Sequence, residues 1–115
     1  KEETMMNTVV NEQGVFQLKD LVSYGERRVI HKSLVANDKV RMSVISLAPR
    51  AELQDHPAPM DALLFALDGE AVFTHEGKDY VFKAGDNFSM KKGDRHHIKA
   101  TTNFKFALLL TEPEA

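Results

Sequence analysis

The chain has 115 residues, which is enough for one domain with its own hydrophobic core. Hydrophobic residues make up 43% and charged residues 28%, the balance of an ordinary globular protein. Acidic and basic residues are interspersed and the formal net charge is -2, so we expect binding neither to nucleic acid nor to a membrane. Cysteine is absent, which excludes disulfides, thiolate metal ligands and cysteine nucleophiles.

The distribution of apolar residues predicts the cellular location of the protein and its division into an arm and a domain. No apolar run approaches the roughly 20 residues that a membrane-spanning helix needs. The first ten residues, KEETMMNTVV, lack the apolar core of a signal peptide, so we expect a cytoplasmic protein. Residues 1–12 are polar and aperiodic and predict an N-terminal arm. Residues 13–112 then predict a single folded domain.

Short apolar segments recur along the domain, and turn residues lie between them. In chain order we expect strands at 15–16, 26–35 (an edge strand), 39–48, 62–67, 71–74, 79–82, 87–90, 96–100 and 104–110. We expect turns at Asp68–Gly69, Glu76–Lys78, Gly85–Asp86 and Lys92–Asp94. No segment repeats apolar residues at helical spacing. The pattern therefore predicts an all-β domain, either a sandwich or a barrel.

The run LDGEAVFTHEGKDYVFKAGDNFSMKKGDRHHI resembles the cupin superfamily, and in particular its small single-domain conserved-barrel (cupin 2) members. The second cupin motif is matched by Gly85, Gly93 and His96, with Lys91 in place of its proline and Ala100 in place of its asparagine. The resemblance implies a double-stranded β-helix, or jelly-roll, barrel.

The first cupin motif is only partly kept. Its two histidines fall on Gln54 and His56. Its glutamate falls on Asp61 when counted forward from His56, or on Ala62 when counted back from Gly69. We favour Ala62 as the inward residue, because turning Asp61 inward would need a β-bulge.

In metal-binding cupins the motif histidines and glutamate hold one divalent ion. The resemblance therefore implies a site at His56 and His96, with Gln54 or Asp61 as a weaker third ligand. Alternate residues of a strand share a face, so Gln54 and His56 can both point inward while His97 points outward from the barrel. Imidazoles suit Zn, Ni, Fe, Mn or Cu, but a tight site needs three or four ligands. Without an ion the histidines would be hydrogen-bonded polar groups of a pocket.

Around these residues we expect a ligand pocket. Its candidate members are Gln54, His56, Met60, Ala62, Met90 and His96, with apolar walls from Met42, Val44, Leu64, Phe88 and Phe106. The predicted function is the binding of a small molecule in the barrel lumen. The alternative is an enzyme acting on a small organic substrate, either an oxygenase-like metalloenzyme or an isomerase or epimerase with a histidine base. No residue can be assigned as catalytic.

The remaining histidines are expected to be structural. His31 should be exposed in the edge strand, and His75 should be a surface residue beside the hairpin turn. The strands at 62–67 and 104–110 are apolar on both faces, which predicts a homodimer with part of the sheet surface buried between subunits.

Overall fold

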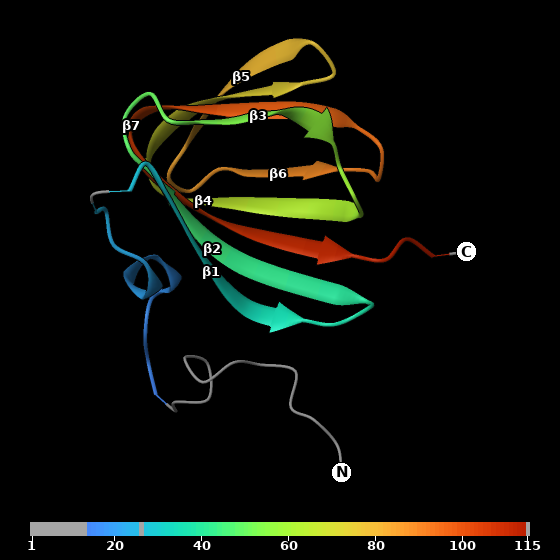
Figure 1. The fold of residues 1–115 in the computed structure, drawn as a ribbon, viewed down its shortest axis with the longest axis horizontal. Coiled ribbons are helices and arrows are strands. Elements are labelled where there is room, and N and C mark those ends of the chain that lie inside the picture. Colours follow the sequence, from blue (N-terminus) through green and yellow to red (C-terminus); the bar gives the residue numbers. More distant parts are fainter. Residues whose placement is uncertain (1–13, 26, 115) are drawn as a thin grey trace.

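The computed structural model describes residues 14–25 and 27–114, so the predicted arm at 1–12 lies outside the described residues. The described chain is mostly β-strand with one short 3-10 helix (Figure 1), which confirms the all-β prediction. Its elements are the 3-10 helix η1 (Leu18–Leu21) and the strands β1 (Val29–Ala36), β2 (Val40–Leu47), β3 (Glu52–Pro57), β4 (Asp61–His75), β5 (Lys78–Lys83), β6 (Asn87–Met90) and β7 (Arg95–Thr111). No helix of these residues is long and apolar enough to cross a membrane.

The strands form one antiparallel sheet in the order β1-β2-β7-β4-β5, with β3 also paired to β7 and β6 also paired to β4. Figure 1 shows this sheet curled over on itself into a jelly roll, with β1 and β2 near one end of the view and β3 and β5 near the other. The jelly-roll prediction is therefore confirmed. β1 lies at the end of the strand order, as predicted for an edge strand.

The two longest strands, β4 and β7, pair with each other along nearly their whole length. The sequence predicts a separate strand on either side of Asp68–Gly69, with a chain-reversing turn there. That prediction is wrong, because both residues lie within β4, where the register against β7 shifts. Gly69 has φ 78°, and a Cβ at this position would lie 1.7 Å from the carbonyl oxygen of Asn103. Asp68–Gly69 is therefore a bulge at which the strand pair bends without reversing.

The N-terminal segment is bound to the outer face of the sheet beside this bulge. The hydroxyl of Tyr24 donates to Oδ2 of Asp68 over 2.6 Å. Nζ of Lys105 donates to the carbonyl of Lys19 over 2.7 Å and lies 4.7 Å from the centre of the Tyr24 ring. Burial raises the pKa of Tyr24, and the neighbouring Asp68 carboxylate raises it further.

The predicted strand at Val15–Phe16 is wrong. Phe16 is exposed, and the next residues form η1 instead. Leu18 and Leu21, which are one 3-10 turn apart, both pack on an outer apolar cluster, so the segment buries more apolar surface as a helical turn than as a strand.

Two apolar clusters form the core. The inner cluster lies inside the barrel, and its buried residues include Phe73, Phe82, Phe104 and Phe106. The outer cluster is built around Val22, Leu34, Val44 and Ala107. The prediction that Met42 and Val44 line the lumen is wrong, because Met42 packs on the outer cluster and it is Ile45 and Leu47 that join the inner one. The residues of β2 that face the lumen are therefore the alternate set to the one that the sequence predicts.

Replacing Gly69 by alanine should destabilise the protein strongly, because the new Cβ would meet the Asn103 carbonyl as well as an unfavourable φ. We expect a loss of at least about 3 kcal/mol in the free energy of unfolding, measured by urea denaturation. Gly77→Ala is the matched control, since Gly77 has φ 82° but nothing within 4 Å of its Cβ position. The control should cost only about 1 kcal/mol. Equal losses of unfolding free energy in the two variants would contradict the claim that the Asn103 carbonyl excludes a Cβ at residue 69.

Candidate ligand-binding site

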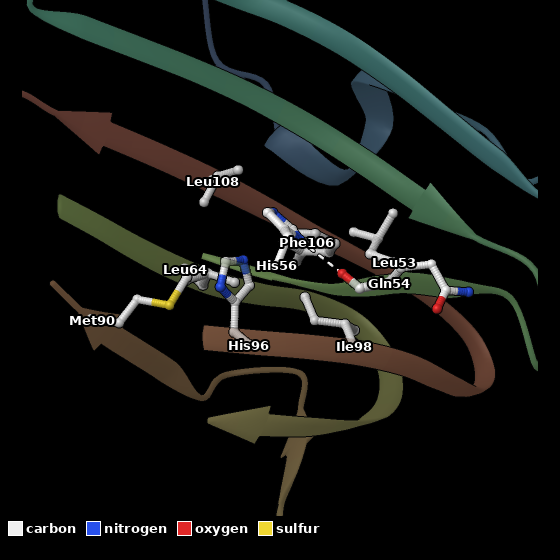
Figure 2. Close-up of a pocket in the computed structure, with 9 residues that line it drawn as sticks. All are labelled: Leu53, Gln54, His56, Leu64, Met90, His96, Ile98, Phe106 and Leu108. Carbon is white, nitrogen blue, oxygen red and sulfur yellow. Dashed lines mark hydrogen bonds between the residues drawn. The ribbon is translucent and has the colours of Figure 1, made fainter. Parts of the chain in front are cut away.

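A cavity of about 370 Å³ opens into the barrel between β3, β4, β6 and β7 (Figure 2). Its walls are formed by Leu53, Gln54, His56, Leu64, Met90, His96, Ile98, Phe106 and Leu108. The apolar residues lie on several strands, whereas the two imidazoles come from neighbouring positions on β3 and β7. The cavity is thus an apolar space with one polar corner.

The structure brings together four of the six predicted pocket residues. Gln54, His56, Met90 and His96 line the cavity. Met60 and Ala62 are not among the lining residues and are instead buried in the inner cluster.

At the ambiguous first-motif position, the structure turns Ala62 inward. Ala62 is 6% exposed and belongs to the inner cluster. Oδ1 of Asp61 accepts a hydrogen bond from the main-chain N–H of Lys92 over 2.9 Å. The register of β4 against β7 is regular from Asp61 to Ala66, so the strand lacks the bulge that would turn the carboxylate inward.

Three further residues line the cavity and were not predicted from the sequence: Leu53, Ile98 and Leu108. Ile98 and Leu108 lie two residues beyond His96 and Phe106 on β7, so strand alternation alone would have found them. Leu53 lies in β3 where the pairing with β7 shifts between Leu53 and His56. That irregularity has no signal in the sequence. Phe88, which was expected in the wall, packs against the rings of neighbouring aromatic residues and does not line the cavity.

His56 and His96 are cross-strand partners, and their ring centroids are 4.2 Å apart. Nδ1 of His56 lies 2.7 Å from the carbonyl oxygen of Gln54. Nδ1 of His96 lies 3.2 Å from the carbonyl oxygen of Asp94. A carbonyl oxygen can only accept, so each Nδ1 must carry the proton of the hydrogen bond. In the neutral ring, each Nε2 is then an unprotonated acceptor.

The surroundings of His96 favour its neutral form. Its side chain is buried, and this burial lowers the pKa of His96 from 6.5, because the imidazolium form loses its hydration. The carbonyl of Asp94 acts in the opposite direction, while proximity to His56 and His75 lowers the pKa further and Asp55 raises it. Burial is the largest of these effects, so His96 is neutral at neutral pH.

His75 is more than the surface hairpin residue that the sequence predicts. It is half-buried, with Nε2 2.8 Å from Oδ2 of Asp94 and its ring 5.2 Å from that of Phe88. The hydrogen bond from His75 is the main cause of a lowered pKa at Asp94, whose carboxylate also accepts the N–H of Lys91. Asp94 therefore links His75 through its side chain to His96 through its carbonyl.

The other two histidines take no part in the cavity. His31 is exposed on β1, as predicted. Nε2 of His97 lies 2.7 Å from Oε1 of Glu52, and His97 is absent from the cavity wall.

The residues of the cavity do not fit the ion that metal-binding cupins hold. Within 14–25 and 27–114 there is no group of three or more His, Cys, Asp or Glu residues that would hold a metal. An amide at Gln54 and a methyl group at Ala62 stand at two of the four ligand positions of the family pattern. Two imidazoles alone are too few for a tight divalent site.

Comparison with known proteins decides the family. Residues 43–112 match the family model of the cupin domain, Cupin_2. The chain is a cupin. No curated protein matches this cupin.

Three solved structures resemble the chain. A conserved protein of unknown function from Streptococcus pyogenes is 25% identical, with full coverage of both chains and a TM-score of 0.89. A cupin 2 conserved barrel domain protein from Leptotrichia buccalis is 34% identical over 84% of this chain and 47% of that one, with a TM-score of 0.80. A predicted oxalate decarboxylase from Thermotoga maritima is 27% identical over 74% of this chain and 81% of that one, with a TM-score of 0.69.

Titration of the histidine ring signals by NMR should give His96 a pKa below 6.5. An unfolded chain takes up a proton at this residue near 6.5, whereas the folded chain resists it to lower pH. The stability contributed by neutral His96 is thus fully present above pH 6.5 and is lost as pH falls through the folded pKa. His96→Gln should reduce the pH dependence of unfolding in that window. A His96 pKa at or above 6.5 would contradict the burial argument.

Proposed function

We propose that this cupin binds a small, mostly apolar molecule in the barrel lumen. The supporting observation is the cavity of about 370 Å³ with six apolar and three polar lining residues. Ligand sites in proteins have this composition, in which apolar walls supply affinity and a few polar groups fix orientation. Leu64, Ile98 and Phe106 would contact the body of the ligand, and the imidazole pair would contact its polar group.

Binding is better supported than catalysis. An isomerase or epimerase needs a base and a second proton carrier placed on either side of the substrate. His56 and His96 stand together in one corner, with ring centroids 4.2 Å apart. Among the residues that the structure describes, the wall contains no carboxylate, lysine, arginine or tyrosine that would serve as the opposite group. An oxygenase-like centre would need a carboxylate ligand, and Ala62 occupies that inward position.

A thermal-shift screen with small apolar alcohols, phenols, acids and sugars tests the binding proposal. A ligand that binds the folded state raises the melting temperature by mass action. Leu108→Trp should abolish that increase, because the indole would fill the cavity from its wall. Lys99→Trp is the matched control, since this exposed residue of β7 lies beside Ile98 in the chain but does not line the cavity. A panel without any stabilising compound, or equal responses from the two variants, would contradict the proposal.

The imidazole pair should bind a divalent metal only weakly. Prolonged dialysis against a chelator is expected to leave the melting temperature unchanged, because the fold does not use an ion to satisfy buried groups. Zinc added in calorimetry should bind far more weakly than at a three- or four-ligand site, and His56→Ala or His96→Ala should remove that binding. Stoichiometric, tightly held metal in protein purified without a metal-affinity column would contradict this prediction.

We also propose that the chain forms a homodimer through the outer face of the sheet. Leu63, Phe65 and Leu109 remain only partly buried there, and a second copy would cover them. Sedimentation analysis should give twice the chain mass, and a mass of one chain would refute the proposal.

A further inference from the structure

The imidazole pair presents hydrogen-bond acceptors to the cavity. The Nδ1–H groups of His56 and His96 are used by the carbonyls of Gln54 and Asp94, at 2.7 and 3.2 Å. The Nε2 atoms therefore remain as acceptors in the neutral rings. Figure 2 shows both rings among the apolar side chains of the wall. A ligand group that satisfies them must carry a proton to donate.

Gln54, the third polar residue of the wall, adds no hydrogen-bond donor beside the two imidazole acceptors. Gln54 is exposed, and in Figure 2 its side-chain amide extends away from the two imidazole rings, toward the Leu53 side of the cavity. Its N–H groups are thus not placed to serve a ligand group held between the rings.

Charged ligand groups are poorly matched to this corner. Within 14–25 and 27–114, no lysine or arginine lines the wall to neutralise a carboxylate or phosphate, and no carboxylate lines it to neutralise an ammonium group. The nearby charged residues are already paired outside it, with Asp55 bound to Arg95 at 2.8 Å and Asp94 bound to His75 at 2.8 Å. A charge held against the buried ring of His96 would lack a partner, which is costly.

Among neutral donors, a hydroxyl group fits better than an amide. An amide would bring a carbonyl oxygen into the cavity, where the described wall offers no donor close to the imidazoles. An unpaired buried carbonyl costs free energy. A hydroxyl donates its proton to an Nε2 and brings no separate acceptor group.

We propose that the ligand of this cavity is a neutral, mostly apolar molecule headed by a hydroxyl group, an alcohol or a phenol, which donates to the Nε2 of His56 or His96. The proposal rests on the proposed binding function and narrows it to one chemical class. The apolar part of the ligand lies against Leu64, Ile98 and Phe106.

Three probes of matched shape test the head group: para-propylphenol, para-propylanisole and para-propylbenzoate. They share one apolar body and differ in offering a donor, an ether without a donor, or an anion. Affinities are measured by NMR titration at neutral pH with a chelator present, so that a stray metal cannot bind the phenol. We expect the phenol to bind roughly tenfold more tightly than the ether, and the benzoate to bind most weakly.

Variants locate the effect. His96→Leu and His56→Leu should each reduce the preference for the phenol over the ether while leaving binding of the ether within about twofold. His56 is exposed, so its variant tests the proposal even where loss of His96 disturbs folding. His31→Ala is the matched control, because this exposed imidazole on β1 lies outside the cavity and its loss should change nothing.

The outcomes separate the two proposals. Equal affinity for phenol and ether would overturn the hydroxyl assignment and leave binding of apolar molecules intact. Tighter binding of the benzoate would overturn it as well and would show that the pair receives an anion. Failure of all three probes to bind would count against both the hydroxyl assignment and the cavity as a ligand site.

Discussion

The pairing of β4 with β7, bent at Gly69, is the constraint on which the rest of the structure depends. The other sheet strands except β1 pair with one of these two strands, and β1 joins through β2. The bend requires a residue with positive φ and without a Cβ, because the Asn103 carbonyl occupies that space. The same bulge supplies Asp68, which binds Tyr24 and so fixes the N-terminal segment on the outer face. The bulge at Asp68–Gly69 therefore bends the strand pair and also holds the N-terminal segment on the outer face of the sheet.

The site follows from this curvature. β7 enters the curled sheet carrying His96 and Ile98 and, beyond its bend, Phe106 and Leu108, so a single strand contributes to two parts of the cavity wall. β3 adds His56 opposite His96, and main-chain carbonyls fix the orientation of both rings. The cupin fold thus keeps its inward histidines here while Gln54 and Ala62 stand at the other ligand positions. The result is a pair of imidazoles in an apolar pocket whose described wall contains no lysine, arginine or carboxylate.

The sequence predicted the fold and much of the site because both follow from local signals. Turn residues such as Glu76–Gly77 and the spacing of Gly85, Gly93 and His96 identify the later strands. Strand alternation places Gln54 and His56 on one face and separates His96 from His97. Alternation also favoured Ala62 over Asp61. Two misassignments depend on pairing between distant strands. An internal bulge resembles a turn in sequence, and the inward face of β2 depends on its pairing with β7. The contact of His75 with Asp94 joins residues far apart in the chain, and no local pattern encodes it.

Binding of a hydroxyl group in the cavity requires that Nδ1 of both imidazoles carries the ring proton, so that Nε2 of each neutral ring is an acceptor. Nitrogen NMR of the histidine side chains measures this directly, because the chemical shifts of Nδ1 and Nε2 differ between the two tautomers and the imidazolium form. At neutral pH, both rings should show a protonated Nδ1, as their hydrogen bonds to the carbonyls of Gln54 and Asp94 require, and the buried ring of His96 should show an unprotonated Nε2. The tautomer with its proton on Nε2 at either ring, or a charged ring at His96, would contradict this arrangement of acceptors.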